Sequence, residues 1–347
     1  IDEEYATENN WSFISNDLIG YTDIISNPEK GWKKKISFKQ RIKRSDINQN
    51  YNYSLLDLAL SWKNRESPFS CFIDLKKEES LTQNRTIVYE YIGPGLGNYR
   101  YEPDLNTYVY DLNGDYVSFT INIGERTPKT NFLGSQRLSI EFLKNNIFPS
   151  MVITSQNTQD FKGENFAISK IGETNILDTD ISKSFLFSRN EIILSNSKFS
   201  KIWFQYKKNL EGHDPRGNNV AIDKEIGIKN VLKISENSSF KNKIDVHEYS
   251  IDSKVYPSRK RDLFGFWNDF TWQIKLEHKI DLELGLVSGI DKGMVNGKTF
   301  NAEGIGLKGN IVFYLRQNGR LYTEVTFVSI GEENKFGILP PEALKGY

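Results

Sequence analysis

The segment from Tyr91 to Tyr116, YIGPGLGNYRYEPDLNTYVYDLNGDY, contains residue types found in several kinds of binding site. Its first part, Gly93-Pro94-Gly95-Leu96-Gly97, has the spacing G-x-G-x-G. A loop that binds phosphate through backbone N–H groups must open a helix, whereas the residues after Gly97 include a proline and show no helical periodicity. The spacing therefore predicts a wide turn where only glycine allows the backbone to approach another strand.

The second part of this segment has the spacing of a calcium loop. Asp111, Asn113 and Asp115 follow the pattern D-x-N-x-D, in which oxygen ligands converge on the ion. Tyr116 and Asn122 stand where such loops have glycine and glutamate. An Asn-Gly turn flanked by two carboxylates accounts for the same residues. We expect the turn, with calcium as the alternative and no other cofactor.

Tyrosines are concentrated in the same segment, although the whole chain has only 17 of them. Exposed tyrosines stack on sugar rings or pack against a partner protein. Buried tyrosines would instead cover a sheet and direct their hydroxyls towards solvent. The sequence leaves both roles open. The candidate glycan or partner contacts are Tyr91, Tyr99, Tyr101, Tyr108, Tyr110 and Tyr116.

A basic run near the N-terminus is a candidate anion contact. Lys35, Lys39, Arg41 and Lys43 share one parity, so a strand would place them on one face. Such a face could meet the phosphates of an envelope glycolipid or an acidic polysaccharide. Lysines also protect edge strands from aggregation, and a solvated strand face is the simpler expectation.

No catalytic constellation is visible in the sequence. The 3 histidines lie far apart, and no G-x-S-x-G, H-E-x-x-H or Walker pattern occurs. The 45 basic residues balance 45 acidic ones, so net charge predicts no nucleic-acid partner. The single cysteine, Cys71, has apolar neighbours and is expected to be a small buried hydrophobe. We predict no catalytic residues, and a non-enzymatic role is favoured.

Period-two alternation along most of the chain predicts strands. Residues 270–286 show it best, because Phe270, Trp272, Ile274, Leu284 and Leu286 have one parity and the charged residues Lys275, Asp281 and Glu283 have the other. The expected connections are turns at residues 64–68, 211–219, 277–279, 288–298 and 318–319.

The predicted fold class is all-β, with predominantly antiparallel strands and hairpins. Strands of this length would form a large barrel of the outer-membrane type or an extended sandwich, because alternation suits both. A possible boundary near residues 145–160 divides an N-terminal β region, 1–150, from a β-hairpin array, 151–347, although a single domain fits equally. The chain opens at Ile1 without a visible signal peptide, and we expect it to be a piece of a longer protein.

The segment YEYIGPGLGNYRYEPDLNTYVYDLNGDYV, followed by GERTPKTNFLGSQRLSIEF, resembles large uncharacterised exported proteins of Bacteroidota-like bacteria. In that family a Y-x-Y-[IV]-G-x-G-x-G-x-Y … G-D-Y segment precedes a long array of strands. The matching positions are Tyr91, Gly93, Gly95, Gly97, Tyr99, Gly114, Asp115 and Tyr116. The resemblance implies β architecture and a location in the cell envelope, and it implies no activity.

These observations predict a structural or binding component of the bacterial cell envelope, at the outer membrane or cell surface. Its expected partners are other envelope proteins, surface glycans or outer-membrane lipid. The alternative is a secreted polysaccharide-active module, either a carbohydrate-binding domain or a glycoside hydrolase, because any two of the 45 acidic residues could meet in space.

Overall fold

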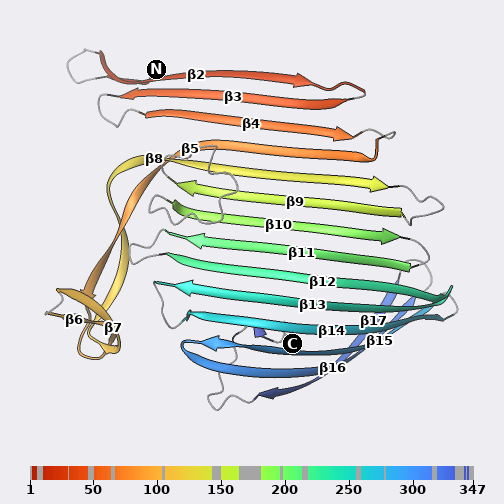
Figure 1. The fold of residues 1–347 in the computed structure, drawn as a ribbon. Coiled ribbons are helices and arrows are strands. Elements are labelled where there is room, and N and C mark those ends of the chain that lie inside the picture. Colours follow the sequence, from red (N-terminus) through yellow and green to blue (C-terminus); the bar gives the residue numbers. More distant parts are fainter. Residues whose placement is uncertain are drawn as a thin grey trace.

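The structure is a computed structural model, and it consists of strands joined by turns and irregular segments (Figure 1). Among the described residues there is no helix long and apolar enough to cross a membrane. The residues that the structure describes are 2–5, 11–29, 31–45, 51–63, 67–103, 106–142, 150–163, 181–195, 198–212, 218–254, 259–276, 279–314, 319–332, 340 and 342–343.

The strands alternate in direction along the chain, as the period-two pattern predicts. Their bounds are β1 (Asp2–Tyr5), β2 (Trp11–Ser26), β3 (Trp32–Ser45), β4 (Tyr51–Lys63), β5 (Phe69–Tyr91), β6 (Gly97–Glu102), β7 (Thr107–Gly114), β8 (Tyr116–Phe142), β9 (Ser150–Gly163), β10 (Ile181–Ser195), β11 (Lys198–Glu211), β12 (Asn219–Ser235), β13 (Ser238–Ser253), β14 (Arg261–Leu276), β15 (Ile280–Val295), β16 (Lys298–Tyr314) and β17 (Arg320–Glu332).

One antiparallel sheet of 14 strands makes up most of the molecule. Its strands follow chain order from β2 to β5 and from β8 to β17, so neighbours in sequence are neighbours in the sheet (Figure 1). The prediction of an all-β, mainly antiparallel fold is confirmed. The predicted closed barrel is wrong for this structure, because the sheet is open and no described residue of β17 has a register partner in β2.

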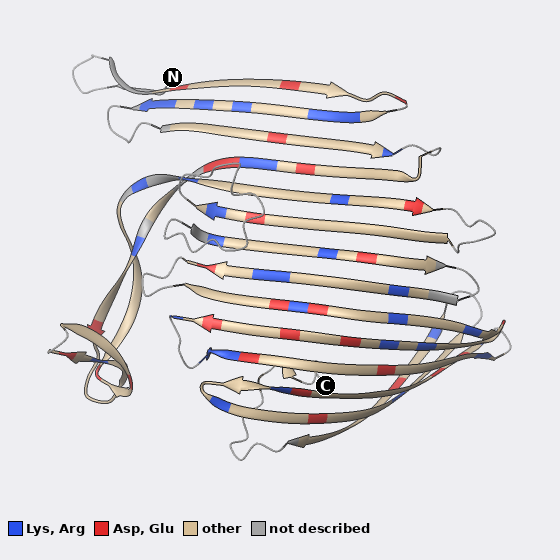
Figure 2. Cartoon of the chain, in the orientation of Figure 1, with Lys and Arg blue, Asp and Glu red and all other residues tan. Residues whose placement is uncertain are grey.

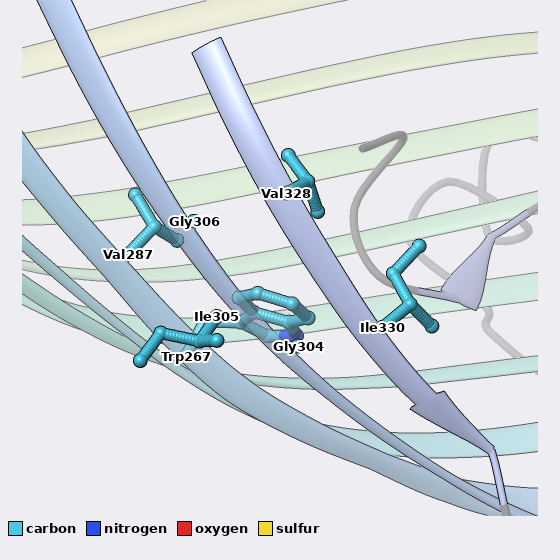
Figure 3. A pocket seen from close by; sticks show the side chains of 7 residues that line it. All are labelled: Trp267, Val287, Gly304, Ile305, Gly306, Val328 and Ile330. Atoms are coloured by element: carbon cyan, nitrogen blue, oxygen red, sulfur yellow. The ribbon is translucent and has the colours of Figure 1, made fainter.

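The two faces of this sheet differ in chemistry. We call the face that contains Phe38, Ile228 and Trp272 the apolar face, and the face that contains Lys35 and Trp267 the polar face. Cross-strand register carries each assignment from strand to strand, because paired residues project to the same side. β15 to β17 curl away from the plane of the other strands (Figure 1). The polar face is the inner side of this curl, since side chains from β14, β15 and β17 converge there (Figure 3).

A two-stranded ribbon leaves the sheet where β5 and β8 continue beyond the pair Glu79–Thr130 (Figure 1). At its end lie the short strands β6 and β7, which pair with each other, and β6 also pairs with β8 at Tyr99–Tyr116. Back in the sheet, β8 pairs with β9 from Thr130–Gly163 to Phe142–Met151. This pairing crosses the predicted boundary, so strands from residues 1–150 and 151–347 belong to one sheet.

The described residues form two buried apolar clusters, one of Phe132, Phe161 and Leu210 on the apolar face and a larger one on the polar face of β14 to β16. Leu263, Trp267, Val287 and Phe300 pack together there, and Ala343 from the C-terminal segment packs against them. Arg261 donates a hydrogen bond to Glu342 Oε1 at 2.5 Å, which holds this segment to β14. Glu342 and Ala343 therefore lie against the inner side of the curl.

Some of the predicted turn positions agree with the structure and others do not. β14 ends at Leu276 and β15 begins at Ile280, so the two strands separate where the sequence predicts a turn at 277–279, and β4 pairs with β5 on either side of the predicted connection at 64–68. Asn318 lies outside the described residues. The predicted turn cluster at 288–298 is wrong, because β15 continues to Val295.

The true turn after β15 is formed by Asn296 and Gly297, whose φ angles are 48° and 76°. Two successive residues with positive φ make the type I′ turn that joins short hairpins. The glycines before it do not break the strand. Gly289 and Gly293 instead lie where a Cβ would meet Trp267 or the backbone of β14.

Candidate functional site

The glycine and tyrosine segment forms the end of the ribbon, which we call the tip, residues 89–116. Gly93 and Gly95 have φ angles of 121° and 69° and form the turn before β6. Gly97 and Gly114 lie opposite each other in the pairing of β6 with β7. A Cβ at Gly97 would lie 2.3 Å from the carbonyl oxygen of Tyr116, so two backbones meet there as closely as only glycine allows. No helix follows the glycines, as expected.

The predicted calcium residues make local contacts within the tip. Asp115 Oδ1 accepts a hydrogen bond from Gly95 N at 2.9 Å, which fixes the glycine turn. Asp111 Oδ1 accepts one from Asn113 N at 3.0 Å, and its Oδ2 lies 3.9 Å from Arg100 Nη1. Within the described ranges, no group of three or more His, Cys, Asp or Glu side chains is placed to hold a metal ion. Calcium binding stays a prediction.

All six predicted tyrosines make ring contacts within the tip, and three of them are also exposed to solvent. Tyr108 stacks on Tyr89 with ring centroids 4.0 Å apart, and it contacts Tyr101 and Tyr116 at 5.1 and 5.0 Å. Tyr99 is buried between Tyr89 and Tyr110. The packed rings therefore form a small aromatic core for the tip.

Three tyrosines of the predicted set remain accessible on the tip. The exposed fractions of Tyr91 and Tyr110 are 56% and 55%, and Tyr101 is exposed to 37%. Leu96, in the turn before β6, and Leu112, in β7, are also exposed. These side chains provide aromatic and aliphatic surface for contact with another molecule.

The basic residues of β3 lie together on the polar face. β3 contains Lys35, Lys39, Arg41 and Lys43, and Figure 2 shows several blue segments along this strand. Lys35 Nζ lies 3.5 Å from Asp57 Oδ2, and Arg41 forms a bidentate ion pair with Asp17. Neighbouring carboxylates thus neutralise two of the four cations. Anion contact stays a prediction.

The apolar face is the largest feature that could contact a partner. Among its exposed side chains, Trp272 and Leu284, which are paired across β14 and β15, are accessible to 44% and 45%. A solvated face of this extent is unusual for a soluble monomer. The exposed apolar side chains of this face include Leu18, Ile24, Phe38, Ile140, Phe142, Ile192, Ile202, Phe204, Ile226, Ile228, Phe264, Phe266, Trp272, Leu284, Leu286, Ile305, Leu307, Val325 and Phe327.

Charged residues of the apolar face gather near one end of the strands. Lys208, Lys224, Glu248 and Lys292 are examples from β11, β12, β13 and β15, and each lies towards the end at which the ribbon leaves. At the other end, Trp32 lies 5.6 Å from Trp62 between ring centroids. The apolar face therefore has one charged margin and one margin with aromatic residues.

The polar face places its ionisable residues in pairs and networks. Glu191 Oε1 lies 2.5 Å from Arg189 Nε and 2.7 Å from Lys201 Nζ. Trp203 Nε1 donates a hydrogen bond to Glu225 Oε1 at 2.9 Å. The predicted charged residues Lys275, Asp281 and Glu283 lie on this face. Opposite charges close together lower the cost of placing them on one surface.

A buried group on the polar face was not found by sequence reasoning. Asp291 is fully buried, accepts a hydrogen bond from Trp267 Nε1 at 3.1 Å, and lies 3.4 Å from His247 Nε2. Gly265 lies between these residues, because a Cβ there would lie 2.0 Å from Asp291 Oδ1 and 2.1 Å from His247 Cε1. The signal in the sequence is a glycine among large residues in a strand, which marks close packing.

The apolar face also has a hollow of about 780 Å³ over β5 and β8 to β11. Aliphatic and aromatic side chains line it together with uncharged polar ones. This hollow brings together none of the predicted site residues. No protein-family model matches the chain, and no curated protein matches it.

Proposed function

We propose that this protein is a non-catalytic component of a bacterial cell envelope whose apolar face contacts membrane lipid. The observation that carries the proposal is the set of exposed apolar side chains on one face of the open sheet, from Ile24 in β2 to Phe327 in β17, which is interrupted over β8 to β11 by a row of uncharged polar side chains. Lipid would cover this surface, whereas water would leave it as a large exposed patch.

The length of the uncharged part of each strand supports membrane contact. On the apolar face, β16 carries no charged residue from Ile305 to Phe313, and β12 carries none from Ile226 to Ile234. A tilted transmembrane strand needs about nine to eleven residues to cross the hydrocarbon region. The length of these two stretches matches the lower end of that range.

The margins of the apolar face support the same placement. Aromatic residues such as Trp32, Trp62 and Trp272 lie towards one end of their strands. Aromatic rings favour the boundary between lipid and water, because their apolar body and polar tip suit both environments. The charged margin with Lys224 and Glu248 would lie in the polar region at the opposite boundary.

The polar face would then face water, as the interior of an outer-membrane β structure does. We infer that the sheet is completed by further strands, because β17 and the part of β2 after Ser15 have one edge without a register partner among the described residues. Backbone groups at an open edge would be costly in lipid.

A second candidate role is recognition of a surface glycan or another envelope protein by the tip. The exposed rings of Tyr91, Tyr101 and Tyr110 favour it, because aromatic rings stack on the apolar faces of sugars and are frequent in protein interfaces. This role is compatible with a membrane-embedded sheet, since the tip projects away from it (Figure 1).

Flotation of the full chain with liposomes tests the membrane placement. The refolded protein is expected to float with liposomes of neutral phospholipid and to remain bound in high salt, because the contact is apolar rather than ionic. In the absence of lipid it should require detergent to stay monodisperse. A monomer that remains soluble without detergent and sediments away from the liposomes would exclude this function.

A further inference from the structure

The hollow on the apolar face has an organised lining. Its walls come from strands that are well separated in the sheet: Ile73 and Leu75 of β5 on one side, and Phe204 and Tyr206 of β11 on the other. Four strand spacings of about 4.8 Å separate these walls, which gives roughly 19 Å. A volume of about 780 Å³ lies within the range of roughly 300–1,000 Å³ found for small-molecule sites.

The floor of the hollow is formed by a row of uncharged polar side chains. Gln136 of β8 lies opposite Asn157 of β9, Asn157 lies opposite Ser188 of β10, and Ser188 lies opposite Tyr206 of β11. Gln159, two residues along β9, is buried beside this row. Amides and hydroxyls both donate and accept hydrogen bonds, so the row suits hydroxyl and carbonyl groups of a ligand.

Apolar side chains surround this row. Phe132 and Leu75 lie over Gly134, where a Cβ would be 2.9 Å from Phe132 Cε1 and 3.3 Å from Leu75 Cδ2. On the other side of the floor, Leu186 and Phe204 line the hollow. Hydrocarbon of a ligand would be removed from water against these walls, and each buried CH₂ contributes about 0.8 kcal/mol.

No charged side chain lines the hollow among the described residues. Lys208 lies opposite Leu186 and Lys224 lies opposite Tyr206, so cations lie beside the hollow but not in its lining. A charged headgroup on the floor row itself would lose water without a charged partner there, which favours an uncharged ligand. A free sugar would bond with the amides but leave the aliphatic walls unused. We propose that the hollow binds an uncharged amphiphile, with its hydroxyl or carbonyl groups on Gln136, Asn157 and Ser188 and its hydrocarbon along the walls.

This inference does not depend on the membrane placement, because a water-soluble protein could bind the same molecule. Isothermal titration of the full chain, in buffer if it is soluble and otherwise in amphipol, with 1-monolauroylglycerol tests it. We expect saturable binding at one site. Maltose and glycerol should not bind, because neither has hydrocarbon to place along the apolar walls.

Two variants locate the binding. Asn157→Asp places a charge in the floor and should weaken monolauroylglycerol binding at least tenfold, and Gln136→Leu removes an amide without adding charge and should also weaken it. Asn230→Asp is the matched control, because Asn230 lies on the same face in β12 but does not line the hollow. Circular dichroism and melting confirm that each variant is folded.

Three results would overturn the inference. These are equal binding by wild type and both floor variants, non-saturable partition alone, and binding of maltose as tight as that of monolauroylglycerol. None of them bears on flotation with liposomes, so failure here is distinct from failure of the membrane placement.

Discussion

Gly289 lies opposite Trp267 in the pairing of β15 with β14, and a Cβ at Gly289 would lie 2.3 Å from Cδ2 of the indole. The indole therefore occupies the space in which other residues carry a side chain. Trp267 is buried and donates a hydrogen bond to Asp291, so the ring cannot move aside without losing that contact. A glycine in one strand thus creates the site for a tryptophan in the next.

Gly289→Ala should destabilise the sheet by about 1–3 kcal/mol, because the methyl group would overlap a packed ring. The change is measured from denaturant unfolding followed by tryptophan fluorescence. Gly309→Ala is the control, because a Cβ at Gly309 has no atom within 4 Å. Equal stability of the two variants would contradict the packing described for Trp267.

The apolar face gives a second prediction, which separates lipid from water as its environment. Leu284→Arg should destabilise the protein in lipid by about 2–4 kcal/mol if Leu284 lies near the middle of the membrane. On a solvated surface the same change would stay within about 0.5 kcal/mol. Unfolding by denaturant in phospholipid vesicles gives the free energy.

The matched control for this test is Gln273→Arg. Gln273 lies opposite Glu283 on the polar face, so the new cation gains a carboxylate neighbour. We expect a change of about 0.5 kcal/mol or less for this half-buried pair at the sheet surface. If both arginine variants behave alike, the two faces are in the same environment and lipid contact is excluded.

The glycines of the tip give a third prediction. Gly97→Ala and Gly114→Ala should each open the tip, because the added Cβ would lie 2.3 Å from the carbonyl oxygens of Tyr116 and Tyr99. Limited proteolysis should cut the tip faster in both variants, while the melting of the large sheet is unchanged. Cleavage at the wild-type rate would show that the two backbones do not approach this closely.

The Asn113-Gly114 turn expected from the sequence is wrong, because both residues lie in β7 and neither has a positive φ angle. Asp115 could hold the glycine turn at Gly95 or bind calcium, and two variants separate these roles. Its Oδ1 accepts the Gly95 N–H, and an asparagine keeps such an acceptor while losing the charge that a calcium ion needs. Asp115→Asn should therefore retain the protease resistance of the tip, and Asp115→Ala should lose it. A calcium-dependent gain in protection that disappears in Asp115→Asn would instead support the ion.

The sequence best predicted the face of the sheet on which a side chain lies, because this depends only on local alternation along a strand. The parity of Trp272, Leu284, Lys275 and Glu283 predicts their faces because a strand has a fixed period of two. The turn at 277–279 follows from the break between two alternating runs. These are local properties of the chain, and a single sequence contains them.

Features that depend on distant residues could not be predicted in this way. Gly289 and Gly293 suggest a turn cluster until the strand opposite is known to carry Trp267. The contact of Gly97 with Tyr116 also joins elements on either side of a hairpin. The open form of the sheet depends on which edges pair, and alternation within each strand is the same for open and closed sheets.

The ribbon begins and ends at two strands that are neighbours in the sheet. Glu79 and Thr130 form a cross-strand pair, so the chain leaves the sheet and returns to it at one place. Residues 80–129 could therefore be replaced by a short turn, or by a different insert, without changing any register between the strands of the large sheet. The ribbon and tip therefore form an insertion between two paired strands. Such an insertion can vary between related proteins while the pairing of the large sheet stays the same.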